Sequence, residues 1–212
     1  MKKIVITGFL PFLGNTVNPS ALLLSELKQP ENAELVTQVL PVEFQKSGEI
    51  LKTLVEKEKP DILLSLGQAG NSPCLSLERV AINLDCTRSA SGKGISPDEA
   101  GMTPVDVKID PDGPDAFFSN LPVWKLLERL NGAGVPAAIS YSAGTYVCNH
   151  VMYVGASLRK DYPGMLTGFV HLPFLPEQLS TMQNPEGKYA MDFEQMKRGI
   201  QIVIEELCSE AG

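Results

Sequence analysis

Histidine is scarce in this chain of 212 residues, which contains only His150 and His171, so a catalytic base has few candidates. Cysteine is also sparse, and no C-x-x-C pair occurs among its four members, Cys74, Cys86, Cys148 and Cys208. This wide spacing argues against a zinc site and against a dense disulfide framework. We therefore expect reduced thiols, no bound metal and a cytoplasmic location.

Long apolar runs and basic clusters are absent as well. No stretch of about 18 consecutive apolar residues occurs, so no segment is expected to cross a membrane. The apolar start of the chain is interrupted by Thr7, Gly8 and Pro11, and no small-residue cleavage site follows, which argues against a signal peptide. The formal net charge of −7 comes from 18 basic and 25 acidic side chains, so nucleic acid is not an expected partner.

The hydrophobic pattern predicts one α/β domain spanning residues 1–212. A hydrophobic content of 43% is enough for one sizeable core. Strands are expected where short apolar or alternating runs occur, at 4–7, 35–42, 62–67, 74–84, 136–139 and 167–172. Helical spacing is found at 21–28, 44–58, 121–130, from Cys148 onward, and at 192–207. This alternation predicts a three-layer α/β/α sandwich around an open, twisted, mostly parallel sheet.

One long segment does not fit this alternation. From residue 85 to 114 the composition shifts to Gly, Pro, Ser and Asp, with only scattered apolar residues. We expect a single long loop there. Loops of this length inside a compact domain are usually functional or mobile.

The stretch around Cys148 is the most suggestive of chemistry. A loop of small residues follows the apolar run 136–139, and a helix-like segment continues through Val151 and Val154. This pattern predicts that Cys148 lies in the first turn of a helix that follows a buried strand. Free N–H groups and the helix dipole make a thiol at such a place easier to ionise and more nucleophilic. The alternative is that Cys148 is a small buried hydrophobe, as most free cysteines are.

Periodicity separates the two histidines. His150 follows Cys148 by two residues, which in a helix turns its side chain about 200° away, so we expect a surface or packing residue. His171 ends the apolar run 168–171, where the strands of open α/β sheets present residues to a crevice. His171 is therefore the better base, the alternative being a structural histidine near a strand end.

A carboxylate completes the set. The alternation over residues 74–84 places Glu78 on a face with apolar side chains, where a charge needs a specific partner. That partner is either Arg79 or Arg88 in a structural ion pair, or an imidazolium. With Cys148 and His171, Glu78 would form the set of a thiol hydrolase, in which backbone N–H groups hold the oxyanion.

Four blocks of sequence carry a resemblance to a known family. They are residues 7–12 (TGFLPF), 77–83 (LERVAIN), 140–149 (SYSAGTYVCN) and 168–173 (GFVHLP). In order and approximate spacing they resemble the pyrrolidone carboxyl peptidases, also called pyroglutamyl peptidases type I, over nearly the whole chain. The resemblance implies a cysteine omega-peptidase that removes an N-terminal pyroglutamyl residue from peptides through a thioacyl-enzyme, without a cofactor. It also implies a homotetramer, with Cys148 as nucleophile, His171 as base and Glu78 as orienting carboxylate.

The resemblance further implies a pocket for the pyroglutamyl ring. Phe9 and Phe12 would form its walls, Asn18 and Gln68 would lie nearby, and Ile95 would belong to the rim. A pyroglutamyl residue has no free α-amine, so its pocket needs no acidic partner. Aromatic faces and backbone hydrogen bonds suit this flat neutral ring. The alternative for Asn18 and Gln68 is ordinary helix capping and loop structure.

The chain also departs from the family pattern. Many members have Pro-Phe-Gly-Gly where Leu13 stands third here, and many have Gly-Arg where this chain has Asn71-Ser72. The loop after Asn83 is longer than usual. Two alternatives therefore remain: an α/β enzyme resembling nucleoside phosphorylases, and a homologue that binds pyroglutamyl groups without turnover.

Overall fold

A six-stranded sheet forms the centre of the protein, with strand order β2-β1-β3-β8-β4-β7. The computed structural model describes residues 1–88, 94–182 and 185–209. The strands of this sheet are β1 (Lys2–Phe9), β2 (Ala33–Leu40), β3 (Ile62–Gln68), β4 (Leu75–Glu78), β7 (Ala137–Ser140) and β8 (Leu166–Leu172). Neighbouring strands pair in parallel except β4 with β8, so β4 and β7 run opposite to the other four. The mostly parallel sheet predicted from the sequence is confirmed.

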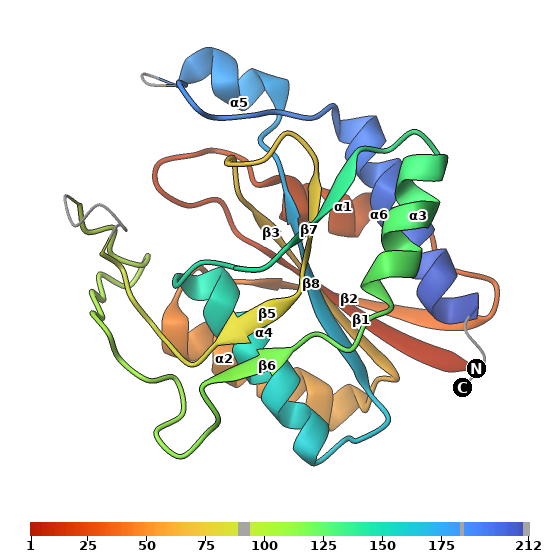
Figure 1. The fold of residues 1–212 in the computed structure, drawn as a ribbon, viewed down its shortest axis with the longest axis horizontal. Helices are drawn as coiled ribbons and strands as arrows, with labels where there is room; N and C mark the ends of the chain where they lie inside the picture. The colour runs from red at the N-terminus through yellow and green to blue at the C-terminus, as the bar shows by residue number, and fades with distance from the viewer. Residues whose placement is uncertain (89–93, 183–184, 210–212) are drawn as a thin grey trace.

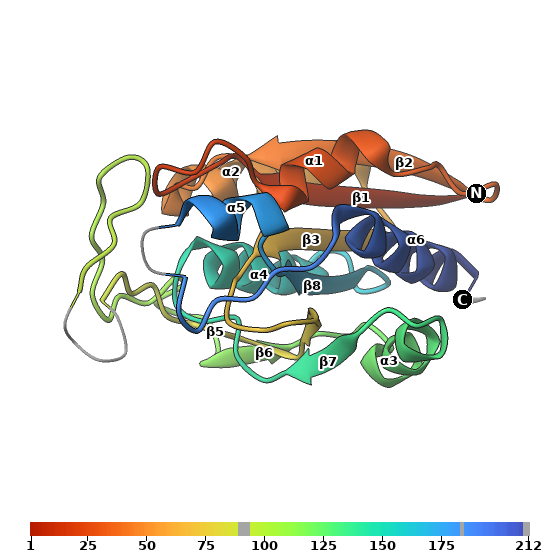
Figure 2. The same cartoon turned by 90° about the horizontal axis from the view of Figure 1, so that it is seen from above.

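Helices cover both faces of this sheet (Figure 1). On one side lie α1 (Pro19–Glu26), α3 (Val123–Gly132) and α6 (Phe193–Ser209), and on the other lie α2 (Phe44–Glu58) and α4 (Val147–Ser157). Shorter helical pieces are the 3-10 turn Leu158–Lys160 and α5 (Pro176–Thr181). The three-layer α/β/α prediction is thus confirmed, and Figure 2 shows the same arrangement from above.

The pleat of the strands explains the two cores. In β1, Ile4 and Ile6 pack with α1 and α6, whereas Val5 belongs to the cluster around α2 and α4. Every residue of β3 is buried, as expected of a strand covered on both faces. None of the helices in the described ranges is long and apolar enough to span a bilayer.

The prediction of one continuous strand over residues 74–84 is wrong. The chain turns at Arg79, whose N–H donates to the Ser140 carbonyl and whose guanidinium lies 5.2 Å from the Phe118 ring centroid. Beyond this turn, β5 (Val80–Ile82) leaves the main sheet and pairs with β6 (Ala116–Phe118). The sequence pattern did not predict β6, because its partner is about 35 residues away in the chain and the strand is short.

Two smaller expectations also change. The strand before Cys148 was expected to be buried, but β7 is an edge strand of the sheet and none of its residues is fully buried. No helix was predicted between residues 172 and 192, whereas α5 begins at Pro176, a residue well suited to the first helical position. The edge position of β7 depends on the order of the strands, which a local sequence pattern does not contain.

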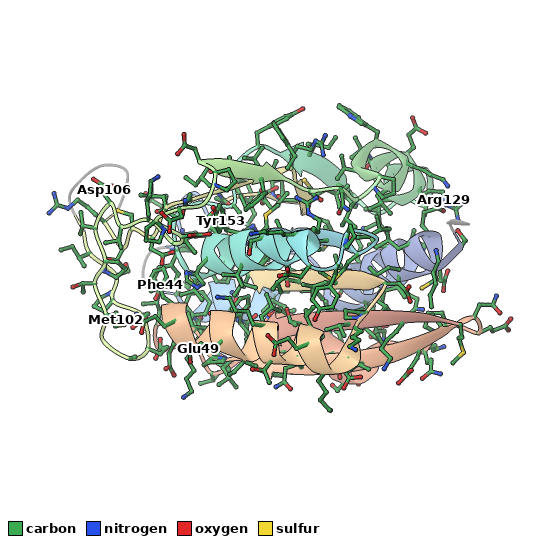
Figure 3. All side chains as sticks on the ribbon, turned by 90° about the horizontal axis from the view of Figure 1, so that it is seen from below. Phe44, Glu49, Met102, Asp106, Arg129 and Tyr153 are labelled. Atoms are coloured by element: carbon green, nitrogen blue, oxygen red, sulfur yellow. The ribbon has the colours of Figure 1, made fainter. Side chains whose placement is uncertain are left out.

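Residues 86–88 and 94–115, here called the arm, extend from the body at the left of Figures 1 and 2. The predicted long loop matches the described part of this segment, while residues 89–93 lie outside the description. Asp98 fixes the arm to the body, because its buried carboxylate accepts a bond of 3.0 Å from the Phe44 N–H at the start of α2. Figure 3 shows Met102 and Asp106 on the arm, at the opposite end of the protein from Arg129.

Candidate active site

Glu78 and His171 form a buried pair on adjacent strands. The antiparallel register of β4 and β8 sets Ser76 opposite His171 and Glu78 opposite Phe169. The Nδ1 atom of His171 lies 2.8 Å from the Oε1 atom of Glu78, and the two residues are 7% and 2% exposed. Because an ionised carboxylate only accepts hydrogen bonds, Nδ1 is the donor, which leaves Nε2 as the nitrogen that can serve another group.

Cys148 is the second residue of α4, as the sequence predicted. The helix is held by apolar residues on its inner face, among them Val147 and Val151. The chain reaches it through the loop after β7, in which Gly144 has a φ of +81°, a conformation that favours glycine. Among the described residues no side chain caps the first turn at Tyr146, so the N–H groups there are available to an anion.

Gly67 makes room for the thiol. It pairs with His171 in the register of β3 and β8, so it lies directly beside the histidine in the sheet. A β-carbon at Gly67 would lie 2.9 Å from the Sγ atom of Cys148 and 2.7 Å from Cζ of Phe169. The absence of a side chain therefore lets the sulfur approach the sheet beside His171. Sequence reasoning did not single out Gly67, although a glycine that ends a buried apolar run was a visible signal.

The electrostatics of His171 favour its charged form. Burial lowers the pKa of its imidazole, but the charge and hydrogen bond of Cys148 and the bond and charge of Glu78 raise the pKa, to about 10 in all. The imidazolium is therefore maintained at neutral pH between two acceptors. Its ring packs against Phe169 with centroids 4.7 Å apart, which restricts the plane of the imidazole.

A cleft of about 560 Å³ opens over these three residues. Its walls include Phe12, Gln68, Tyr146 and the hydroxyl-bearing residues Ser72, Ser76, Ser140 and Ser142. A narrower cavity with an apolar surface continues behind Cys148 and is lined by Phe9, Asn18 and Val42 together with Phe12, Gln68 and Tyr146. The structure therefore brings four of the predicted pocket residues to one place beside the thiol.

The fifth predicted pocket residue lies elsewhere. Ile95 is on the arm, half exposed, in an isolated bridge to Arg88, and it lines neither the cleft nor the narrow cavity. Asn18 has two structural roles. It lines the narrow cavity, and it caps α1 by accepting a hydrogen bond from the Ser20 N–H. The capping alternative for Asn18 is thus realised together with its proximity to the site.

Two buried polar atoms near the thiol have no partner within the described chain. They are Oε1 of Gln68 and Oε2 of Glu78. The Nε2 group of Gln68 donates to Gln178, which orients the amide and directs its oxygen away from that bond. Ser72 bonds to Cys74. An unpartnered buried amide oxygen is a candidate acceptor for a ligand N–H group.

Tyr146 is a wall residue that sequence reasoning missed. Its hydroxyl donates to the Pro97 carbonyl over 2.8 Å, which connects the cleft to the arm. Burial, followed by the charges of Asp98, Glu99 and Cys148, raises the pKa of Tyr146 to about 12, so the phenol remains neutral.

His150 points away from the cleft, as its place on the helix predicts. Its Nδ1 atom lies 2.9 Å from Oδ2 of Asp85, and its ring packs edge-on against Phe44 at 5.9 Å between centroids. It is a buried packing residue with a carboxylate partner. Across residues 1–88, 94–182 and 185–209, no group of three or more His, Cys, Asp or Glu side chains is arranged to hold a metal ion.

The sequence is similar to a known family along its length. A family model described as pyroglutamyl peptidase matches residues 2–210. A pyrrolidone-carboxylate peptidase of Thermosipho africanus is 45% identical over 184 residues, which cover 86% of this chain and 86% of that protein. A protein of the same name from Bacillus cereus is 38% identical over 97% of this chain and 92% of its own length.

The fold is similar to solved structures of proteins with the same names. The pyroglutamyl peptidase I of Bacillus amyloliquefaciens superposes with a TM-score of 0.89 at 35% identity, covering 99% of this chain and 98% of that one. A mutant pyrrolidone carboxyl peptidase of Pyrococcus furiosus gives a TM-score of 0.91 at 34% identity, covering 99% and 100%. Fold and sequence agree over the full length, and the chain belongs to the pyroglutamyl peptidase family.

Proposed function

We propose that this protein is a cysteine peptidase that hydrolyses the amide bond after an N-terminal pyroglutamyl residue of peptides. The contact that carries this proposal is the 2.8 Å bond between His171 and Glu78 beside the thiol of Cys148. The names of the relatives supply the substrate class. Residues 1–212 would act as one catalytic domain, with Cys148 as nucleophile, His171 as acid and base, and Glu78 as the group that orients the ring.

The raised pKa of His171 supports a resting state in which a thiolate faces an imidazolium. The thiolate attacks the scissile carbonyl carbon and forms a C–S bond. As the C–N bond breaks, Nε2 of His171 gives its proton to the departing amine, leaving a thioester on Cys148. Water then gives a proton to the neutral imidazole and adds to the thioester. The C–S bond breaks, pyroglutamate leaves, and the starting ion pair is restored.

The first turn of α4 supports the charge that develops on the carbonyl oxygen. Its uncapped N–H groups, including that of Cys148, point out of the helix end where the dipole is positive. Such fixed donors need no reorganisation during the reaction, and one of them contributes about 10²–10³ in kcat in other acyl-transfer enzymes.

The residues that line the narrow cavity beside Cys148 have a chemistry suited to the pyroglutamyl ring. Phe9 and Phe12 offer apolar faces to a flat ring, and Val42 closes the cavity. Oε1 of Gln68 is free to accept the lactam N–H. No Lys, Arg, Asp or Glu of the described chain lines this cavity, which fits a substrate group without charge.

The test is release of a fluorescent amine from a pyroglutamyl amide. Cys148→Ala should remove the activity while the circular dichroism spectrum stays unchanged. Appreciable residual turnover would refute the assignment of the nucleophile. Turnover of the wild type must also be blocked by iodoacetamide, and a phosphate-dependent release of base from a nucleoside would instead favour a phosphorylase-like enzyme.

The two histidines provide an internal comparison. His171→Ala should lose activity to near the level of Cys148→Ala, because no other imidazole faces the thiol. His150→Ala should keep measurable turnover. The opposite order would show that the base has been wrongly assigned, and no turnover in the wild type, with tight binding of a pyroglutamyl peptide, would identify a binding homologue.

We also propose a cytoplasmic homotetramer. The family resemblance supports the tetramer, and the sparse, free cysteines support a reducing compartment. Light scattering coupled to size-exclusion chromatography measures the assembly directly, with about four times the 23.0 kDa chain mass as the expected result. A monomer at micromolar concentration would contradict the proposal.

A further inference from the structure

A second histidine–carboxylate pair lies on the opposite side of the nucleophile's helix turn. His150 Nδ1 is 2.9 Å from Oδ2 and 3.1 Å from Oδ1 of Asp85, and both residues are buried. The arrangement matches that of His171 with Glu78, in which Nδ1 also meets a carboxylate, at 2.8 Å. The mechanism described above uses only the second of these pairs.

The ring of His150 is held firmly in place. It packs edge-on against Phe44 at the start of α2, and a β-carbon at Gly48 would come within 2.7 Å of its Nε2 atom. Asp85 is held as well, because its backbone exchanges hydrogen bonds of 2.7 and 3.1 Å with Val107 of the arm. The pair thus joins a fixed ring on α4 to a fixed carboxylate beside β5.

Residues 82–86 also form hydrogen bonds to Thr145, before Cys148, and to Asn149, after it. The amide of Asn149 bonds to the backbone of Ile82, donating to its carbonyl and accepting from its N–H, each at 2.9 Å. Thr145 donates to the Cys86 carbonyl and accepts from the Cys86 N–H, at 2.9 and 2.8 Å. Cys148 therefore lies between residues 145, 149 and 150, all of which are bonded to residues 82–86.

Because the chain turns at Arg79, residues before and after the turn reach the two different histidines that flank Cys148. Glu78, just before the turn, reaches His171 in the main sheet. Asp85, after β5, reaches His150 behind the helix. A shift of residues 82–86 would move the first turn of α4 relative to the sheet that carries the base.

We infer that Asp85 and His150 are positioning residues, which hold the first turn of α4 so that the Cys148 thiol meets His171. They touch neither substrate nor the reacting atoms. Their effect should appear mainly in kcat, because displacement of a nucleophile by about 1 Å can cost about 10²-fold in rate. The inference rests on the proposed peptidase function for its kinetic readout, whereas alkylation of Cys148 reports on the thiol without any turnover.

The decisive variant is Asp85→Ala in the full chain, compared with Asp85→Asn, whose amide oxygen still accepts a bond from Nδ1. Asp85→Ala should lower kcat for a pyroglutamyl aminomethylcoumarin about 10-fold or more with KM within about 2-fold. Asp85→Asn should recover to within about 3-fold of the wild-type kcat. Iodoacetamide labelling of Cys148, resolved from the other cysteines by peptide mass spectrometry, should slow in parallel.

Glu49→Gln is the matched control. Glu49 is an exposed carboxylate on α2 that lines the same surface hollow as His150, and Figure 3 shows it near Phe44. Its removal should leave kcat, KM and the labelling rate unchanged. A similar loss in Glu49→Gln would assign the effect to general surface charge and overturn the inference.

A second pair of variants changes His150 instead of Asp85. His150→Gln puts its amide near the position of Nε2 and loses the bond to Asp85, whereas His150→Asn puts an N–H near Nδ1 and keeps it. Only His150→Gln should lose kcat, and Asp85→Ala/His150→Gln should lose no more than either single variant. Unchanged kcat in both disruptive variants, or losses that multiply in the double variant, would overturn the inference. If Asp85→Ala does not fold, the comparison of His150→Gln with His150→Asn decides alone.

Discussion

Replacing Cys148 with Ala should lower the pKa of His171. In the intact site burial lowers this pKa, while Cys148 and Glu78 together raise it to about 10 from the ordinary 6.5. One pKa unit corresponds to about 1.4 kcal/mol, so the net stabilisation of the imidazolium is on the order of 5 kcal/mol. Without the sulfur, burial is opposed by Glu78 alone, and the imidazole should release its proton at a much lower pH.

The scarcity of histidine makes this measurement direct. A nitrogen-15 histidine spectrum of the protein contains signals from only His150 and His171, and His150→Asn identifies which is which. In the wild type, the His171 ring should remain protonated through neutral pH and titrate near 10. In Cys148→Ala its midpoint should move down toward or below 6.5.

Cys208→Ala is the appropriate control for this titration. Cys208 lies on α6, on the other side of the sheet from α4, so its loss should leave the midpoint of His171 unchanged. A midpoint that stayed near 10 in Cys148→Ala would refute the reasoning, because the sulfur would then not be the group that raises the pKa of His171. A wild-type midpoint near 6.5 would refute it equally.

Three further variants test other parts of the site. Glu78→Gln keeps the shape of the side chain but removes its charge and the fixed tautomer of the base, so kcat should fall about 10²–10⁴-fold with a similar KM in steady-state assays. Gly67→Ala should lower kcat about 10-fold or more, since its β-carbon would meet the sulfur at 2.9 Å, whereas Gly132→Ala, with no atom within 4 Å, should be neutral. Gln68→Met removes the free amide oxygen and should reduce kcat/KM about 10–100-fold, while the alkylation of Cys148 keeps its rate. Unchanged kcat/KM would exclude Gln68 from lactam recognition.

Elements with a strong local pattern were predicted well. The helix Phe44–Glu58 has the predicted bounds, because Ile50, Leu51, Leu54 and Val55 share a face and Pro60 follows its end. The buried run that begins at Ile62 is β3, as its unbroken apolar character indicated. In both cases the period of the hydrophobic residues carries the information, and that period depends only on neighbours in sequence.

Elements that depend on distant partners were not predicted. The alternation over residues 74–84 looks continuous, but the chain leaves the main sheet at Arg79, whose N–H still bonds to the Ser140 carbonyl and whose guanidinium lies over the Phe118 ring. The strand β6 exists only because β5 leaves the sheet to pair with it. Single-strand patterns contain no information about such partners.

The sequence by itself predicted that Cys148 lies in the first turn of α4 and that the side chain of His150 points away from it. The helical period directs His150 away from Cys148, and the apolar run before His171 places this imidazole near the carboxyl end of β8. Only the tertiary structure decided the other contacts: Gly67 beside the sulfur, Glu78 on Nδ1 of His171, and Asp85 on Nδ1 of His150. The physical reason is distance along the chain. These bonded groups are about 65 to 93 residues apart, so their contact depends on how the strands are ordered and where the chain turns. No local sequence pattern encodes either feature.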